Sequence, residues 1–426
     1  MDDVSRMVAR QYEAYAYPAP FTDLAAQIAE GYFEFGNPAD YAALLWPEGR
    51  PRRPLSILAA GCGTVQAAYL AHTNRDSEVI GVDLSEASLA HERFLQERHG
   101  LANLRLFRGD LREVHELGRR FDCIVCSGVL HHLADPDAGL RALAGVLAPQ
   151  GAMTLMLYGA TARTGVYMLQ DALRRLRVPQ SAEGVAFARR LVEQLPDDHF
   201  ARWYLRGAAE LRDDAAFVDT FLHPQDRAYT VPQVLDFLER NGLAFGGWVD
   251  NAHYYADAAL ARFTPEVRGA VAALPAREQW AVVEMLTQNL GMHMLAARHA
   301  GEGTPAPEPD FASPGWQSLV PRRVPGLRRA EAGGRAGSAG VASIADNPRA
   351  SSAAPAVAFS RSGQTIELGP GQAALLEAAD GSRRIADLLA LPALAQVPAA
   401  AREPLTREFL AQMWRLGHLL FARGAA

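Results

Sequence analysis

The sequence predicts an α/β fold in which a parallel sheet is covered by helices on both faces. Between residues 53 and 160, apolar runs of strand length alternate with segments of helical periodicity, as in parallel sheets whose strands are connected by helices. Several runs are apolar without a break, which is typical of strands buried on both sides. The first run ends in a glycine turn and the second in an acid, an arrangement found in nucleotide-binding units of this class.

Five strands and three helices are expected in this region. The helix over residues 85–100 has Ser85 as its N-cap and Gly100 as its stop. The expected strands are residues 55–60, 78–85, 104–110, 121–130 and 152–159, and the expected helices are residues 65–74, 85–100 and 136–151.

The strand rhythm stops after Gly159, and the remaining chain has a different organisation. Residues 161–301 are mainly helical in pattern, with late strands of the core around 243–263 as an open alternative, and residues 277–301 predict one long helix ending at Gly301. Residues 302–356 have the composition of a flexible linker. The chain therefore divides into a helical N-terminal lid (1–52), an α/β core (53–160), a helical substrate or lid region (161–301), the linker, and a small, mainly helical C-terminal domain (357–426).

The composition excludes several classes of protein. Apolar residues make up 49% of the 426 residues and charged residues 21%, as in a globular protein of two or three domains. The net charge of -6 argues against a general binder of nucleic-acid backbones. No apolar run has the length of a membrane span, and the first residues lack the apolar core of a secretion signal. Three cysteines cannot form a disulfide framework, so we expect a cytoplasmic protein.

Candidate binding residues follow one another at the expected strand ends. Gly61 and Gly63 close the first strand, where the absence of a Cβ lets the backbone approach a ligand. Asp83 closes the second strand, where a carboxylate can accept hydrogen bonds from both hydroxyls of a ribose. Asp110 closes the third strand and could accept from an exocyclic amine, and Ser127 begins the segment SGVLHHLADP after the fourth. The carboxyl ends of such strands share one crevice, so these residues predict a single site.

In this order, GCG, VIGVDLS, RGDL and SGVLHHLADP resemble the motifs of the class I S-adenosylmethionine-dependent methyltransferases. The resemblance implies a Rossmann-like sheet of seven strands, with S-adenosyl-L-methionine as the cofactor. It places the methionine portion over Gly61 and Gly63, the ribose at Asp83 and the adenine amine at Asp110. The cofactor-binding residues that it implies are Tyr17, Ala60, Gly61, Cys62, Gly63, Gln66, Asp83, Leu84, Gly109, Asp110, Leu111, Ser127 and Gly128.

Two positions depart from the pattern of this family. Ala59 replaces the usual acid before the glycine turn, so the methionine amino group needs another partner, for which Gln66 is the candidate. Val65 replaces the last glycine and predicts a bulkier floor to the pocket. A Rossmann enzyme that uses NAD is the alternative, but its GxGxxG pattern is broken here, and HHLxDP has no role in hydride transfer.

Histidines are the candidate bases for an oxygen or ammonium nucleophile, because their ordinary pKa lies near neutrality. The resemblance turns His131 toward the cofactor and His132 elsewhere; the alternative is that both only cap or pack the loop. His223 is the second candidate, because Asp219, His223 and Asp226 lie within eight residues of sequence. The alternative there is a polar loop that caps the following helix.

Tyr17 lies in QYEAYAYPAP, before a proline-stiffened turn. N-terminal segments of this kind cover the cofactor in similar enzymes, and the alternative is a tyrosine that fills an interface. The basic run PRRVPGLRRA is expected to be solvated linker charge, with a docking patch as the alternative.

No metal site is expected. Cys123 and Cys126 stand at an odd offset along a strand, which directs their thiols to opposite faces. His293 and His299 lie six residues apart in the expected long helix, which is not the i, i+4 spacing of a ligand pair.

The C-terminal domain resembles a winged-helix-type module. It is similar to the C-terminal domains of some bacterial protein-lysine methyltransferases and to small peptide-chaperone domains of the PqqD type. Arg383 and Arg384 are its only adjacent basic pair, so DNA reading is not expected. Partner or peptide binding, or dimer formation, is expected instead.

Together these observations predict an S-adenosylmethionine-dependent methyltransferase that acts on an N, O or C nucleophile of a small-molecule acceptor. A peptide or protein acceptor, recognised by the helical region and the C-terminal domain, is the alternative. A cofactor-binding regulatory protein without turnover is the third hypothesis. No nucleic-acid or membrane partner is expected.

Overall fold

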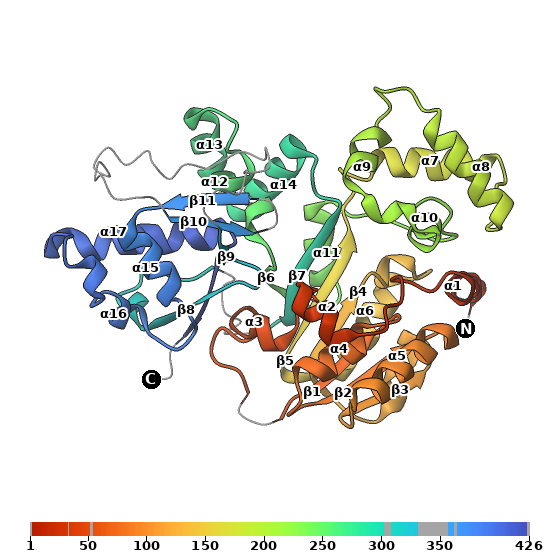
Figure 1. Ribbon diagram of the computed structural model, residues 1–426, viewed down its shortest axis with the longest axis horizontal. Helices are drawn as coiled ribbons and strands as arrows, with labels where there is room; N and C mark the ends of the chain where they lie inside the picture. Colours follow the sequence, from red (N-terminus) through yellow and green to blue (C-terminus); the bar gives the residue numbers. More distant parts are fainter. Residues whose placement is uncertain are drawn as a thin grey trace. The chain divides into compact units, whose positions relative to one another are not determined.

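The computed structural model describes residues 2–32, 34–51, 54–301, 308–330, 357–361 and 364–423. The chain forms two compact units (Figure 1). Unit 1 comprises residues 1–39, 52–245 and 288–304, and unit 2 comprises residues 40–51, 246–287 and 305–426.

A seven-stranded sheet with the order β3-β2-β1-β4-β5-β7-β6 organises the first unit. Strands β1 to β5 run parallel, and β7 pairs antiparallel with β5. The seven-stranded α/β sheet expected from the sequence is confirmed. The strands are β1 (Ser56–Ala60), β2 (Glu78–Asp83), β3 (Leu104–Arg108), β4 (Phe121–Ser127), β5 (Leu147–Tyr158), β6 (Leu243–Trp248) and β7 (Met292–His299).

Helices and short 3-10 turns connect these strands and precede the first of them. Helices α4 and α5 lie against β2 and β3. The elements up to β6 are α1 (Asp3–Ala14), α2 (Leu24–Glu30), α3 (Pro38–Leu45), α4 (Gln66–Thr73), α5 (Glu86–His99), η1 (Leu111–Leu117), η2 (Leu130–His132), α6 (Pro136–Val146), α7 (Thr164–Arg175), α8 (Ala182–Glu193), α9 (Ala201–Gly207), η3 (Ala209–Arg212), α10 (Asp214–Phe221) and α11 (Val231–Glu239).

Local sequence signals set several of these boundaries. The Ser85 side chain accepts a hydrogen bond from Ser88 N at 3.1 Å and begins α5. Gly100 ends the same helix in the left-handed conformation, with φ of 58°, which glycine adopts without strain. The predicted cap and stop of this helix are therefore confirmed.

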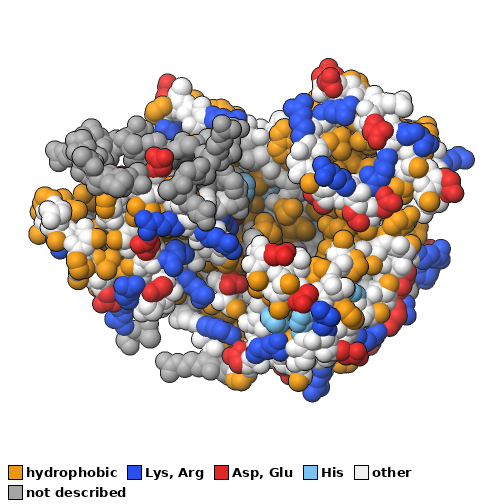
Figure 2. Space-filling model, viewed as in Figure 1, with side chains coloured by type: hydrophobic (Ala, Val, Ile, Leu, Met, Phe, Trp, Pro, Cys, Tyr) orange, Lys and Arg blue, Asp and Glu red, His pale blue; other side chains and the backbone are white. Residues whose placement is uncertain are grey.

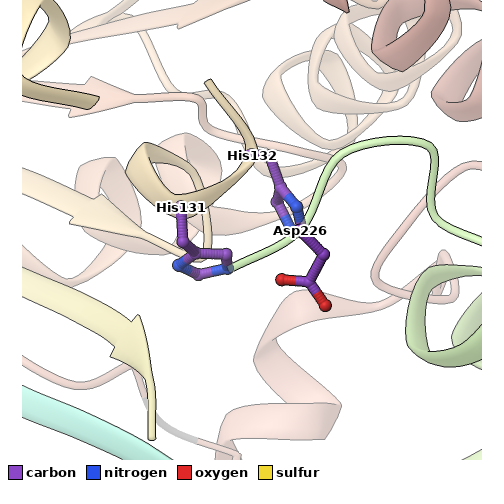
Figure 3. Close-up of side chains that lie close together, drawn as sticks. All are labelled: His131, His132 and Asp226. Atoms are coloured by element: carbon purple, nitrogen blue, oxygen red, sulfur yellow. The ribbon is translucent and has the colours of Figure 1, made fainter. Parts of the chain in front are cut away.

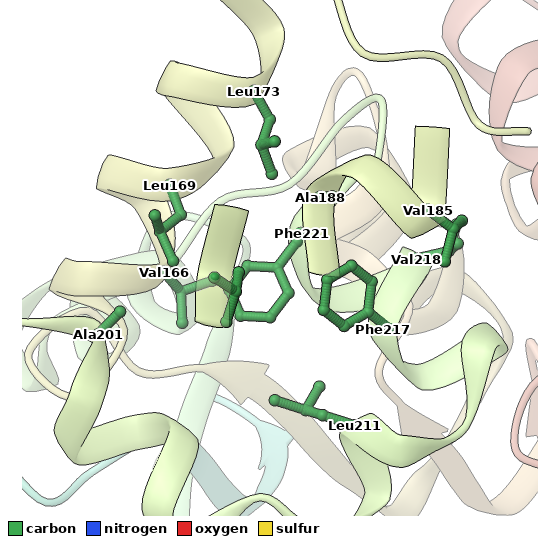
Figure 4. Packing of buried hydrophobic residues seen from close by; sticks show 11 residues of the cluster. Val166, Leu169, Leu173, Val185, Ala188, Ala201, Leu211, Phe217, Val218 and Phe221 are labelled. Atoms are coloured by element: carbon green, nitrogen blue, oxygen red, sulfur yellow. The ribbon is translucent and has the colours of Figure 1, made fainter. Parts of the chain in front are cut away.

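Helices α7 to α10 form a separate helical layer around their own apolar core. Phe217 and Phe221 on α10 face Val166 and Leu169 on α7, and all four side chains are at most 3% exposed (Figure 4). Burial of this kind contributes about 2 kcal/mol for each large side chain. The layer is therefore a packed part of unit 1, and it positions the residues at the start of α7 and on α10.

The long helix expected over residues 277–301 is wrong in its second half. Helix α14 (Ala276–Thr287) stops before Gln288, which has a φ of 52°, and residues 292–299 form β7 instead. The register of β7 against β5, with Leu295 opposite Leu155, explains the difference. Short apolar runs fit the periodicity of a helix as well as that of a strand, and pairing with a buried strand decides between the two. His293 and His299 consequently lie on a strand.

His293 makes the stability of unit 1 sensitive to acid. Burial lowers the pKa of His293 from 6.5 to about 4, so between these pH values the unfolded chain binds a proton that the folded chain does not. We expect this residue to cost up to about 3 kcal/mol of unfolding free energy as the pH falls from 6.5 to 4.

Urea unfolding at pH 7.0, 5.5 and 4.5 measures this loss. His293→Gln is the comparison, because a glutamine amide does not titrate. Its nitrogen can replace the Nε2 of His293, which lies 2.9 Å from the Tyr229 carbonyl. The variant should lose less stability than the natural chain at low pH. Equal slopes for the two proteins would contradict the assignment.

Unit 2 contains two small sheets and the remaining helices. The sheets have the orders β11-β10-β9 and β12-β8. Trp248 stacks on Tyr254 with ring centroids 3.8 Å apart and belongs to its core. The elements are η4 (Asn251–His253), α12 (Ala256–Ala259), α13 (Pro265–Ala272), α14, η5 (Trp316–Ser318), β8 (Leu319–Arg323), β9 (Arg328–Arg329), β10 (Val357–Arg361), β11 (Gln364–Leu368), α15 (Pro370–Ala378), α16 (Ile385–Leu388), η6 (Pro392–Leu394), α17 (Ala399–Arg415) and β12 (Leu419–Arg423).

The expected linker and the domain boundaries differ from the structure. Residues 319–323 pair with β12, and Trp316 beside them is 2% exposed. The run PRRVPGLRRA therefore belongs to β8 and β9 rather than to a solvated linker. Residues 302–307 and 331–356 of the expected linker lie outside the described residues. Residues 246–287 belong to the same unit as the C-terminal domain. Contacts between segments far apart in the sequence determine this division, and the composition of the sequence does not reveal them.

The described surface carries both signs of charge. On the face in Figure 2, acidic and basic side chains are interspersed, in keeping with the net charge of -6. No helix among the described ranges combines the length and the apolar character that crossing a membrane requires.

Candidate active site

A cavity of about 430 Å³ lies in unit 1, at the carboxyl ends of the central strands. Among the predicted cofactor residues, Ala60 is absent from its lining because its side chain is fully buried in β1. The predicted residues that line it are Tyr17, Gly61, Cys62, Gly63, Gln66, Asp83, Leu84, Gly109, Asp110, Leu111, Ser127 and Gly128.

The glycine turn leaves no room for side chains. Gly61 has a φ of 72°, and a Cβ there would lie 2.4 Å from Val129 Cγ2. Gly63 has a φ of 56°, and a Cβ there would lie 2.9 Å from the Tyr17 carbonyl oxygen. Thr64 Oγ1 also donates to the Pro18 carbonyl at 2.7 Å. The N-terminal segment therefore packs directly on the turn, and glycine is required at both positions.

Asp83 is held rigidly at the end of β2. Its Oδ2 accepts from Gly63 N and its Oδ1 from Ser85 N, both at 2.8 Å. Burial raises the pKa of Asp83 above its ordinary value, and the backbone hydrogen bonds oppose that shift. The carboxylate thus connects the first two strand ends of the site.

Asp110 at the end of β3 is paired with Arg112. Its Oδ1 accepts from Arg112 N and Nε at 2.9 Å each. Burial raises the pKa of this carboxyl, but the hydrogen bonds from Arg112 outweigh it and hold the pKa below its ordinary value. Asp110 is therefore an ionised acceptor beside the cavity.

Glu34 is an acid in the cavity that the sequence did not predict. Its carboxylate accepts from Gln66 Nε2 at 3.4 Å and from the Tyr32 hydroxyl. Burial raises its pKa, against the effect of these two hydrogen bonds. Glu34 reaches the glycine turn from the segment after α2, so no spacing in the sequence relates it to β1. Ala59, where the family carries its acid, is fully buried in β1.

Asp219 on α10 is the centre of a second polar group in the cavity. Its Oδ1 accepts from the Tyr12 hydroxyl at 2.8 Å, and its Oδ2 accepts from the Tyr158 hydroxyl at 2.9 Å. The residue is 4% exposed. Asp219 and both tyrosines line the cavity, so three distant segments of the chain meet at this carboxylate.

Arg163, just before α7, forms a buried ion pair with Asp226. Its Nη2 lies 3.2 Å from Asp226 Oδ2, and the two side chains are 3% and 0% exposed. Gln170 Nε2 donates to the same oxygen at 2.9 Å. The guanidinium also lies 3.7 Å from the centre of the Tyr158 ring. The positive charge of Arg163 is therefore matched inside the protein.

The two neighbouring histidines lie in the reverse of the expected arrangement. His132 lines the cavity, whereas His131 is fully buried behind it. Burial, followed by repulsion from His132 and Arg163, holds the pKa of His131 well below 6.5. Its ring packs on Tyr158 with centroids 3.9 Å apart. The turn η2 explains the difference, because it directs consecutive side chains to different sides.

Hydrogen bonds indicate which ring nitrogens carry protons. Gln225 N donates to His223 Nδ1 at 3.1 Å, so a neutral His223 has its proton on Nε2. Burial lowers the pKa of His223 well below 6.5, and the residue is absent from the cavity lining. His132 Nδ1 lies 3.0 Å from the Gln225 carbonyl, which only accepts, so in the neutral ring the proton is on Nδ1 and the lone pair on Nε2. His132 is therefore the histidine available at the cavity.

His131, His132 and Asp226 lie close together (Figure 3), with one potential ligand atom of each within 4.8 Å of the others. The guanidinium of Arg163 forms an ion pair with Asp226, so the negative charge that would hold a metal ion is already balanced. A second positive charge there would be repelled, so the group does not favour a metal ion.

Comparisons with known proteins match the core of unit 1. Residues 58–153 match the family model described as a methyltransferase domain. An uncharacterised protein of Synechococcus sp. is 36% identical over 268 residues, which are 60% of this chain and 63% of that protein. The ubiquinone/menaquinone biosynthesis C-methyltransferase UbiE of Idiomarina loihiensis is 25% identical over 138 residues, 32% of this chain and 55% of that protein. The chain thus spans less than two thirds of these two curated relatives.

Solved structures extend the likeness to most of the chain. PKMT2 from Rickettsia typhi, alone and in complex with AdoHcy, aligns over 92% of this chain and 77% of its own. The TM-scores are 0.65 and 0.63, at 16% and 14% identity. At such identity the likeness is one of fold.

Proposed function

We propose that this chain, which carries a class I methyltransferase domain, transfers a methyl group from S-adenosyl-L-methionine to a nucleophile of an acceptor. The observation that carries the proposal is that Gly61, Gly63, Asp83 and Asp110, from three successive strand ends, line one cavity together. The spacing and order of these residues match the family motifs, and the matched domain over residues 58–153 contains all of them.

The residues present fit this cofactor. Gly61 and Gly63 line the cavity without side chains, so the backbone can lie against the methionine portion. Asp83 holds both carboxylate oxygens in place for the ribose hydroxyls, and Asp110 is an ionised acceptor for the adenine amine. The bound cofactor supplies an electrophilic methyl group on a sulfonium; the chain binds it, orients it and excludes water.

Glu34 replaces the acid that β1 lacks. Its carboxylate lies beside Gln66 in the cavity and can accept from the methionine ammonium. Gln66, the candidate from the sequence, then positions Glu34. We expect Glu34→Gln to weaken binding of S-adenosylhomocysteine about 30-fold, because a charged hydrogen bond contributes about 2 kcal/mol.

Calorimetric titration with S-adenosylhomocysteine measures this effect. Glu30→Gln is the matched control, because it makes the same change at an exposed residue at the end of α2, and its affinity should equal that of the natural chain. Equal affinities for all three proteins would show that Glu34 does not hold the ammonium.

The acceptor is first a small molecule, in keeping with a cavity of about 430 Å³. A peptide or protein acceptor is the second candidate, and the helical layer α7 to α10 and unit 2 favour it, since both lie outside the matched residues 58–153. Incubation with methyl-labelled cofactor and a cell lysate, followed by separation of small molecules from protein, distinguishes the two. Label in neither fraction would contradict methyl transfer.

A further inference from the structure

We propose that the acceptor atom is the nitrogen of an amine that is protonated in solution, and that Asp219 holds its ammonium group. The inference rests on the proposed methyl transfer and names the substrate class of the same site. It concerns the end of the cavity beyond the glycine turn and the strand-end acids, where Asp219, Tyr158 and His132 meet.

Asp219 has capacity left for a ligand. Each carboxylate oxygen accepts from one tyrosine hydroxyl, at 2.8 and 2.9 Å, with a long contact of 3.5 Å from Gln11 Nε2. A carboxylate offers about four acceptor sites. Arg112 and Arg163 pair with Asp110 and Asp226, and no ion pair among the described residues includes Asp219, so tyrosine hydroxyls rather than a cation orient its carboxylate. A buried anion of this kind is suited to a cation.

The charges of the lining favour the same class of acceptor. Glu34, Asp83, Asp110, Glu210 and Asp219 line the cavity, and Arg163 is the sole arginine or lysine among the lining residues that the structure describes. The guanidinium is already paired with Asp226. A carboxylate or phosphate acceptor would therefore meet repulsion from the cavity lining as a whole, whereas an ammonium would be attracted.

Aromatic rings surround the same end. Tyr12, Tyr17, Tyr158 and Tyr204 line the cavity, and tyrosine faces attract ammonium groups within about 6 Å of the ring centre. A carboxylate among tyrosine rings combines an ion pair with cation–π contact. This combination selects a cationic amine over a neutral alcohol.

His132 is placed to accept the proton that the ammonium must lose. Its Nδ1 faces the Gln225 carbonyl, which leaves a lone pair on Nε2. One ring nitrogen of His132 lies within 4.8 Å of a carboxylate oxygen of Asp219, so one ammonium can contact both groups. Proton transfer requires such contact in the bound complex.

The step balances with the named reactants. The ammonium gives one proton to His132, and the nitrogen lone pair forms a bond to the methyl carbon as the carbon–sulfur bond breaks. The electron pair of that bond remains on sulfur and gives neutral S-adenosylhomocysteine. The product is the N-methylated ammonium, and His132 releases its proton to solvent.

Chemical identification of the methylated product tests the proposal. The full chain is incubated with methyl-labelled S-adenosyl-L-methionine and a cell lysate, and each labelled product is identified by mass spectrometry before and after mild base. Label on an amine nitrogen, in the small-molecule or the protein fraction, is expected and identifies the source. Label released as methanol by base, or found on a phenol, thiol or carbon, overturns the inference and leaves methyl transfer standing. No label in any fraction contradicts the transferase function itself.

Asp219→Asn tests the role of the carboxylate. We expect kcat/KM for the labelled amine to fall about 100-fold, as for removal of one partner of a buried charge pair, while affinity for S-adenosylhomocysteine changes less than about 3-fold, which also shows that the variant folds. Asp213→Asn is the matched control, since Asp213 caps the same helix from an exposed position and asparagine caps equally well. An equal loss of cofactor affinity and amine turnover in Asp219→Asn would place the residue in the cofactor site and overturn the assignment.

Discussion

Asp83→Ala is expected to reduce the affinity for S-adenosylhomocysteine at least about 100-fold. The carboxylate would bind both ribose hydroxyls, and each hydrogen bond to a charged group contributes about 1.5–3 kcal/mol. The same carboxylate accepts from Gly63 N and Ser85 N, so its removal also leaves two strand-end donors without their partner. Calorimetric titration measures the change in affinity.

Asp198→Ala provides the control for this change. Asp198 is exposed and lies outside the cavity lining, so its removal should leave the affinity unchanged. If Asp83→Ala binds S-adenosylhomocysteine as tightly as Asp198→Ala does, the cavity is not the cofactor site and the proposed function fails.

Arg163→Met is expected to lower the free energy of unfolding by about 3–5 kcal/mol. The methionine side chain fills similar space but leaves the charge of Asp226 buried without its partner, which is the costly way to break a buried pair. Contact with the Tyr158 ring, now 3.7 Å from the guanidinium carbon, is lost as well. Urea unfolding followed by circular dichroism measures the loss.

Two comparisons isolate the buried charge. Arg175→Met breaks an ion pair with Asp171 whose side chains are 78% and 54% exposed, and it should leave the free energy of unfolding almost unchanged, because solvent screens an exposed pair. The double variant Arg163→Met/Asp226→Asn should recover part of the lost stability, because no unpaired charge remains. A loss in Arg163→Met no larger than in Arg175→Met would contradict the account.

The central sheet and the cofactor end were predictable because their signals are local. Gly61, Gly63, Asp83 and Asp110 each stand directly after an apolar run, and the topology of parallel sheets brings such positions to one edge. The resemblance to class I methyltransferases, drawn from these positions, is confirmed by the matched domain and by the fold. The individual ligand contacts of these residues stay predictions.

Residues that reach the cavity from distant segments were less predictable. Glu34 lies in a loop without a motif, and its place beside Gln66 results from tertiary packing. Strand β7 was predicted as helix, because its partner β5 is far away in sequence. Asp219, His223 and Asp226 lie within eight residues of sequence, yet their spacing does not show that Asp219 alone of these three lines the cavity.

The exchange of His131 and His132 has a geometric cause. A motif fixes the presence of both histidines, whereas the backbone of η2 determines which side chain faces the cavity. The structure buries His131 against Tyr158 and places His132 in the cavity lining. A role of His131 as a base stays a prediction, which its burial disfavours.

The two ends of the site differ in the sequence separation of the contacts that build them. Gly63 and Asp83 are 20 residues apart, whereas Tyr12 and Asp219 are 207 apart. Closing a longer loop costs more chain entropy, and contacts of high sequence separation slow folding. During synthesis, the glycine turn and the acids of β2 and β3 are complete before α10 exists. The cofactor end can therefore assemble first, and the tyrosine–carboxylate group proposed to bind the acceptor forms only after α10 has packed against the first helix of the chain.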